Sequence, residues 1–82
     1  MEKITEQLVL AMDYDAQEKW DEAHEVVKDI QHEMAFRIHA YLHRKEGDLA
    51  NANYWYQRVG EDAFCGSLED EKNNILQHLK DN

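Results

Sequence analysis

The chain has 82 residues and a formal net charge of −9, from 18 acidic and 9 basic side chains. This length predicts one helical domain, residues 1–82, with a thin hydrophobic core. The acidic balance argues against nucleic acid, where neutralised phosphates supply most of the affinity, and against an anionic membrane surface. With 43% hydrophobic residues the chain is expected to fold, and its thin core makes a homodimer or another protein partner a reasonable expectation.

Cysteine content and the N-terminal segment predict the cellular compartment. Cys65 is the only cysteine, so no intramolecular disulfide can form. The N-terminal residues do not read as a signal peptide, and no apolar run is long enough to cross a bilayer. We therefore expect a cytoplasmic protein with no membrane contact.

The first three helices follow from the spacing of apolar side chains. The first is predicted over residues 2–14, and the polar stretch 13–19 contains the turn that follows it. The second is predicted over residues 19–31. The third is predicted over residues 33–46 and ends at Gly47, which suits a left-handed position. Because the third segment is apolar around much of its circumference, we expect it to lie at the centre of the fold.

Two more helices complete the prediction. Asp48 is placed as the N-cap of the fourth helix, which Gly60 ends. After a loop over residues 61–66, Ser67 and Asp70 fit the S/T-x-x-D/E start of a fifth helix. No segment alternates with a period of two, so the fold class is predicted to be all-α, with four to five helices.

The second and fourth helices carry a similar apolar pattern, 29 residues apart. A pair of helical hairpins is the unit of helical repeat proteins, although an ordinary small bundle would also accommodate two hairpins and a C-terminal helix. The corresponding positions are Trp20, Ala23, Val26, Val27 and Ile30 in one helix and Leu49, Ala52, Trp55, Tyr56 and Val59 in the other.

Two segments carry resemblances to known families. The segment EGDLANA, residues 46–52, resembles the turn and second-helix start of a tetratricopeptide repeat, without that family's proline or full motif. The segment WDEAH at 20–24 and the segment HRKEGDLANANYWY at 43–56 resemble a family of small, uncharacterised bacterial helical proteins. The resemblance implies two antiparallel hairpins in a tetratricopeptide-like arrangement plus a C-terminal helix, and it implies no activity.

Polar side chains gather beside the predicted apolar faces. His39, His43 and Glu46 have i, i+4, i+7 spacing and therefore project from one side of their helix. His24 lies at the edge of the second helix's apolar stripe, and close packing of the two hairpins would bring it to the other histidines. The candidate ligand-binding residues are His24, His39, His43, Glu46, Asn51 and Tyr54.

Three interpretations of this cluster stay open. Imidazole and carboxylate at helical spacing can bind zinc or iron, in which case His39, His43 and Glu46 would be the ligands. No specific metal motif is met, however, so we favour structural histidines hydrogen-bonded within the core and expect no cofactor. General acid–base catalysis is the third interpretation, but no nucleophile accompanies the histidines and no catalytic residue is assigned.

The function expected from the sequence is a non-enzymatic helical interaction module that binds a protein or peptide. The alternative is a small-molecule or metal-binding protein, with an enzymatic role included in that alternative, which uses the histidine and glutamate cluster. The two differ in what they require of the histidines. An interaction module would tolerate their replacement by apolar residues, whereas a binding site would lose its ligand.

Overall fold

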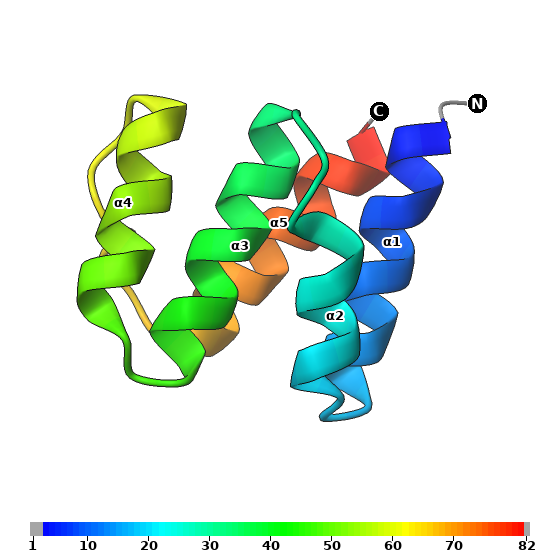
Figure 1. Cartoon of the computed structure of the whole chain (residues 1–82), viewed down its shortest axis with the longest axis horizontal. Coiled ribbons are helices and arrows are strands. Elements are labelled where there is room, and N and C mark those ends of the chain that lie inside the picture. The colour runs from blue at the N-terminus through cyan, green and yellow to red at the C-terminus, as the bar shows by residue number, and fades with distance from the viewer. Residues whose placement is uncertain (1–2, 82) are drawn as a thin grey trace.

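The computed structural model describes residues 3–81, which form five helices and no strand (Figure 1). The all-α prediction is therefore confirmed. The helices are α1 (Lys3–Ala16), α2 (Trp20–Val27), α3 (Glu33–Lys45), α4 (Leu49–Val59) and α5 (Leu68–Asp81). None of these helices combines the length and the apolar character needed to cross a membrane.

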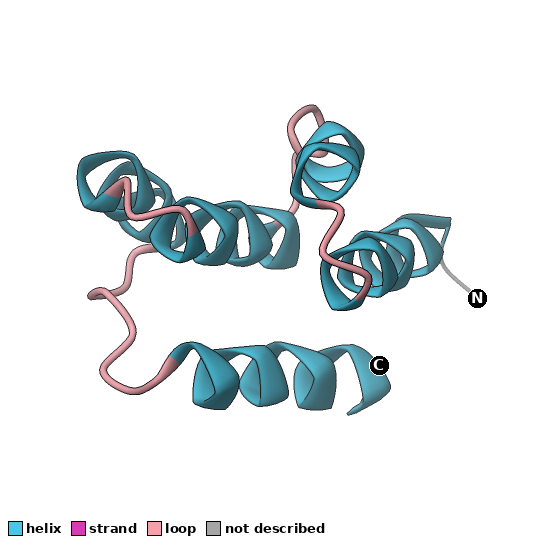
Figure 2. Ribbon diagram, turned by 90° about the horizontal axis from the view of Figure 1, so that it is seen from below, coloured by secondary structure: helices cyan, strands magenta, loops and turns pink. Residues whose placement is uncertain are grey.

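The helices are arranged as two hairpins with a fifth helix beneath them. In Figure 1, α3 lies between α2 and α4, and short turns join α1 to α2 and α3 to α4. Figure 2 shows α5, which ends at the C-terminus, lying along one side of the layer formed by the other four helices. Among the described helices, α4 packs mainly against α3 and contacts α5 through the hydrogen bond from the Tyr56 hydroxyl to Glu71, whereas α5 packs against both α1 and α3.

The ends of α3, α4 and α5 follow the signals in the sequence. Gly47 has φ +89° just past α3, and Gly60 has φ +82° at the end of α4, the left-handed conformation that glycine adopts most readily. Asp48 Oδ1 accepts a hydrogen bond from the Asn51 amide at 3.2 Å. Ser67 Oγ accepts one from the Asp70 amide at 3.0 Å, so both predicted N-caps are confirmed.

The first two helices end at other places than predicted. The first continues to Ala16, and Glu18 takes φ +61° in the turn that follows. The second ends at Val27 rather than near residue 31. After α2 the chain reaches His32, which is extended and caps α3, where its Nδ1 accepts a hydrogen bond from the Met34 amide at 3.1 Å. The polar stretch before α2 contains no glycine or proline, so periodicity alone could not place these ends.

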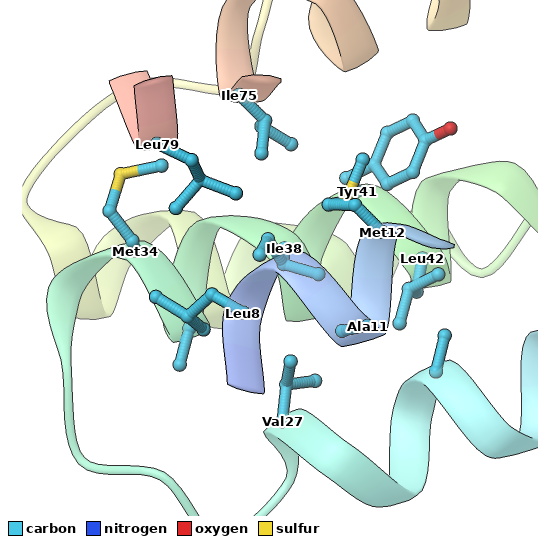
Figure 3. Packing of buried hydrophobic residues seen from close by; sticks show 12 residues of the cluster. Leu8, Ala11, Met12, Val27, Met34, Ile38, Tyr41, Leu42, Ile75 and Leu79 are labelled. Carbon is cyan, nitrogen blue, oxygen red and sulfur yellow. The ribbon is translucent and has the colours of Figure 1, made fainter. Parts of the chain in front are cut away.

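The main hydrophobic core lies where α1, α2, α3 and α5 converge (Figure 3). Each helix contributes residues from one face at i, i+3, i+4 spacing, which is why the apolar periodicity located them. Ile30 lies beyond α2 but still packs against this cluster. The buried members are Leu8, Ala11, Met12, Ala23, Val27, Met34, Ala35, Ile38, Tyr41, Leu42, Ile75 and Leu79.

The opposite face of α3 holds α4 through a smaller cluster. Ala40 on α3 packs with Ala52 and Tyr56 on α4, so α3 is buried on two faces and is the central helix, as predicted. One expectation fails here. Leu49, assigned to the buried stripe of α4, is 61% exposed, because α4 packs mainly against α3 and the cluster that joins the two helices takes Ala52 and Tyr56 from α4 and not Leu49.

Candidate metal centre

Three histidines from two helices meet at the interface between α2 and α3. His24 comes from α2, and His39 and His43 lie one turn apart on α3. One ring nitrogen from each histidine lies within 4.8 Å of the other two. The closest pair is His24 Nε2 and His39 Nε2, at 3.0 Å. The expected meeting of the two hairpins at these residues is therefore present in the structure.

Burial favours the neutral form of His24 and His39. His39 is 5% exposed and His43 is 6% exposed, while His24 is half-buried. Burial and the neighbouring His24 and His43 rings lower the pKa of His39 to about 3. Burial, followed by the charge of His43, also lowers the pKa of His24. Neutral imidazole is the form that donates a lone pair to a metal ion.

A carboxylate sets the orientation of the third ring. His43 Nδ1 lies 2.8 Å from Glu46 Oε2, so the carboxylate accepts a hydrogen bond from Nδ1–H, and in the neutral ring the lone pair is then on Nε2. A carboxylate on the second nitrogen of a metal-binding histidine is a recurrent arrangement, because it fixes the tautomer and raises the basicity of the ligand. The metal interpretation from the sequence names Glu46 as a direct ligand beside His39 and His43. In the structure its carboxylate is instead hydrogen-bonded to Nδ1 of His43.

Two indole rings flank the histidines. Trp20 stacks on His24 with ring centroids 4.9 Å apart, and Trp55 stacks on His39 at 4.0 Å. Trp20 Nε1 donates a hydrogen bond to the Leu42 carbonyl at 2.7 Å, which anchors the start of α2 on α3. Both rings therefore restrict the motion of the imidazoles and exclude water from their faces.

Ion pairs to two buried carboxylates hold the last turn of α3 in place. Arg44 pairs with Glu71 at 2.8 Å, and Lys45 pairs with Asp15 at 2.8 Å. Asp15 also accepts a hydrogen bond from the hydroxyl of Tyr41 at 2.8 Å. Since Glu71 belongs to α5 and Asp15 to α1, the turn that carries His43 is tied to two other helices.

The same pairs account for a small basic group on α3. Arg37, Arg44 and Lys45 each have a carboxylate partner, with Glu61 pairing to Arg37. They are structural contacts within the chain.

The two remaining candidate residues do not join the histidines. Tyr54 is 53% exposed, and its ring meets Trp55 edge to face at 5.0 Å. Asn51 lies in the first turn of α4, where its amide is capped by Asp48. Within residues 3–81, no side-chain hydrogen bond connects Asn51 or Tyr54 to the histidine cluster. The residue of α4 that contacts the histidines is instead Trp55, which stacks on His39.

Several residues around the centre could not be identified from the sequence pattern. The spacing of Trp20 and His24, four residues apart, was a usable local signal for their stacking. By contrast, the stacking of Trp55 on His39 joins two helices. The hydrogen-bond partners of buried Asp15 lie 26 and 30 residues away in sequence. Those of buried Glu71 lie 15 and 27 residues away. Charged residues on a helix are normally read as its solvated face.

Comparison with known proteins adds no relative. No protein-family model, no curated protein and no solved structure matches this chain.

Proposed function

We propose that this protein binds one divalent transition-metal ion through His24, His39 and His43. The observation that carries the proposal is the convergence of three ring nitrogens from two helices within 4.8 Å. Nitrogens bound to one tetrahedral zinc at 2.0–2.1 Å stand about 3.3 Å apart, a spacing close to the 3.0 Å between His24 Nε2 and His39 Nε2.

The donor set favours a particular group of ions. Three imidazoles suit Zn²⁺, Co²⁺, Ni²⁺ and Cu²⁺, whereas Mg²⁺ and Ca²⁺ prefer oxygen ligands. Cys65, the single cysteine, is exposed in the loop between α4 and α5 and forms no part of this cluster. A thiolate-based site of the zinc-finger or iron–sulfur type is therefore not what these residues would form.

The surroundings support a site that is prepared for the ion. Neutral rings need lose no proton to bind, and the contacts of Trp20, Trp55 and Glu46 restrict the rings before binding. A histidine that serves only the core requires one hydrogen-bond partner and has no reason to gather two more imidazoles. These features favour the metal-binding interpretation over purely structural histidines.

The test is native mass spectrometry and titration calorimetry with Zn²⁺, on protein purified without a metal-affinity tag. One ion per chain is expected, and His24→Gln and His39→Gln should abolish the binding. His78→Gln is the matched control, because His78 lies exposed on α5 away from the cluster. Circular dichroism shows whether each variant is folded, and His24→Gln, at the half-buried ligand, is the variant least expected to disturb the core. Equal binding by the wild type and a folded His24→Gln protein would refute the site.

A second candidate is the interaction module expected from the sequence, with a second copy of this chain as the partner. The observation that favours it is α4, which packs mainly against α3 and exposes Leu49 and Tyr54. The two hairpins support a tetratricopeptide-like use of such a surface. Light scattering coupled to gel filtration should then give a dimer mass that Leu49→Glu converts to a monomer, while Leu76→Glu on α5 leaves it unchanged. A monomer mass for the wild type would exclude this candidate.

A further inference from the structure

Resting on the metal site proposed above, we infer that the bound ion keeps one exchangeable coordination position. That position would be filled by water or hydroxide and would accept a small inorganic anion in its place. Four observations on the residues around the three histidines lead to this assignment.

First, the described chain supplies three ligand atoms and no fourth. Within residues 3–81, the group of histidine, cysteine, aspartate and glutamate side chains that contains His24 consists of that residue, His39 and His43. Zinc in proteins is almost always at least four-coordinate. Three protein ligands with one exchangeable position is the arrangement of catalytic zinc sites, whereas structural sites have four protein ligands.

Second, the nearest carboxylates are engaged elsewhere. Glu46 and Asp48 form a separate group with His43, again within 4.8 Å. Glu46 is held at Nδ1 of His43 at 2.8 Å, and the lone pairs of the two imidazole nitrogens diverge, so this carboxylate lies away from an ion at Nε2. Asp48 caps α4 through the Asn51 amide at 3.2 Å.

Third, the aromatic residues that flank the cluster cannot complete the coordination. An indole has a single N–H donor and no lone pair to offer a metal ion. In Trp20 this donor is already bonded to the Leu42 carbonyl. His24 is half-buried, in contrast to the buried His39 and His43, so it is the most solvent-exposed of the three histidines.

Fourth, the charge of the centre favours an anion. Three neutral imidazoles leave the full double charge of the ion uncompensated by any direct ligand. Such an ion lowers the pKa of its bound water toward neutrality and attracts anions of matching size. The chemical class expected at the fourth position is therefore hydroxide or a small monodentate anion.

The experiment uses the full chain loaded with Co²⁺, whose visible absorption reports the ligands and geometry of the ion. Addition of azide should change the absorption bands saturably, and perchlorate at equal ionic strength should not. Glu46→Gln is expected to bind Co²⁺ more weakly but, once saturated with the ion, to retain the azide response, since Glu46 is a positioning residue for His43 and not a ligand. Glu25→Gln, an exposed substitution on α2 with the same change in charge, is the matched control.

The outcomes separate the two proposals. A saturable azide response in the wild type, in Glu46→Gln and in Asp48→Asn supports the exchangeable position. A cobalt spectrum that azide leaves unchanged overturns this inference while the metal site stands. The inference is also overturned if Glu46→Gln or Asp48→Asn changes the cobalt spectrum to that of a different coordination geometry, because a protein carboxylate would then be the fourth ligand. Failure of Co²⁺ to bind in any form overturns the metal site itself.

Discussion

The imidazole of His39 lies flat against the indole of Trp55, with ring centroids 4.0 Å apart and an angle of 15° between the planes. This contact joins the most buried ligand of the proposed centre to α4, which also packs on α3 through Ala52 and Tyr56. A second stacked pair, Trp20 on His24, occupies the other side of the cluster. Because these are the only two tryptophans of the chain, its intrinsic fluorescence reports directly on the histidines.

The first prediction uses that fluorescence. Cu²⁺ at one equivalent should quench the emission of the wild type, since it quenches indoles within a few ångströms. Trp20→Phe and Trp55→Phe each leave one reporter, and both variants should still be quenched because each indole contacts a ligand imidazole. His78→Gln should behave as the wild type. Unchanged quenching at one equivalent in His24→Gln would place the ion elsewhere.

The second prediction concerns Glu46, which fixes the tautomer of His43 through a 2.8 Å hydrogen bond. Glu46→Ala should weaken Zn²⁺ binding by about 10- to 100-fold, the usual effect of removing such a carboxylate. The melting temperature of the metal-free protein should change little, because the Glu46 side chain is 40% exposed. Calorimetry of Glu46→Ala beside the exposed Glu25→Ala measures the difference, and equal affinities in the two variants would contradict the role of Glu46.

The third prediction follows from the pKa of His39, which is about 3 in the folded protein against an ordinary value of 6.5. Above pH 6.5 the ring is neutral in both the folded and the unfolded chain, and its contribution to stability is fully present. Below pH 6.5 the unfolded chain gains a proton that the folded chain does not. The free energy of unfolding should then fall by up to about 1.4 kcal/mol per pH unit from this residue, until the pH nears 3.

Urea unfolding of the metal-free protein at pH 7.5 and pH 5 tests this expectation. His39→Gln removes the titrating ring, so its stability should depend less steeply on pH than that of the wild type. The carboxylates titrate in both proteins and cancel in the comparison. Parallel losses of stability in the two proteins would show that His39 is not held neutral by the fold.

The fourth prediction concerns the buried carboxylate of Asp15, which accepts hydrogen bonds from Tyr41 and Lys45, both at 2.8 Å. Asp15→Ala should destabilise the protein by about 3 kcal/mol, because it leaves the buried Tyr41 hydroxyl without its partner and removes the nearer carboxylate of the partly buried Lys45 amine. Asp13→Ala, an exposed change on the same helix, is the matched control. A loss below about 0.5 kcal/mol in Asp15→Ala, the range of ordinary surface changes, would contradict the structural role.

Sequence reasoning succeeded where the physical cause lies within a few residues. Asp48 and Ser67 cap helices through amides three positions ahead, and Gly47 and Gly60 take left-handed conformations that other residues adopt at a cost. It failed at the end of α2, where no local breaker marks the stop. It also failed at Leu49, whose exposure depends on how few neighbours α4 has.

The sequence by itself determined the all-α class, most helix ends and the alignment of His39, His43 and Glu46 on one side of α3, because helical geometry relates residues one and two turns apart. Tertiary structure alone decided that His24 meets His39 at 3.0 Å, that Glu46 lies behind His43, and that Trp55 covers His39. It also decided that the carboxylates of Asp15 and Glu71 are buried. Contacts between helices depend on how their faces pack across the core, and the periodicity of one helix carries no information about the side chain that another helix brings to meet it.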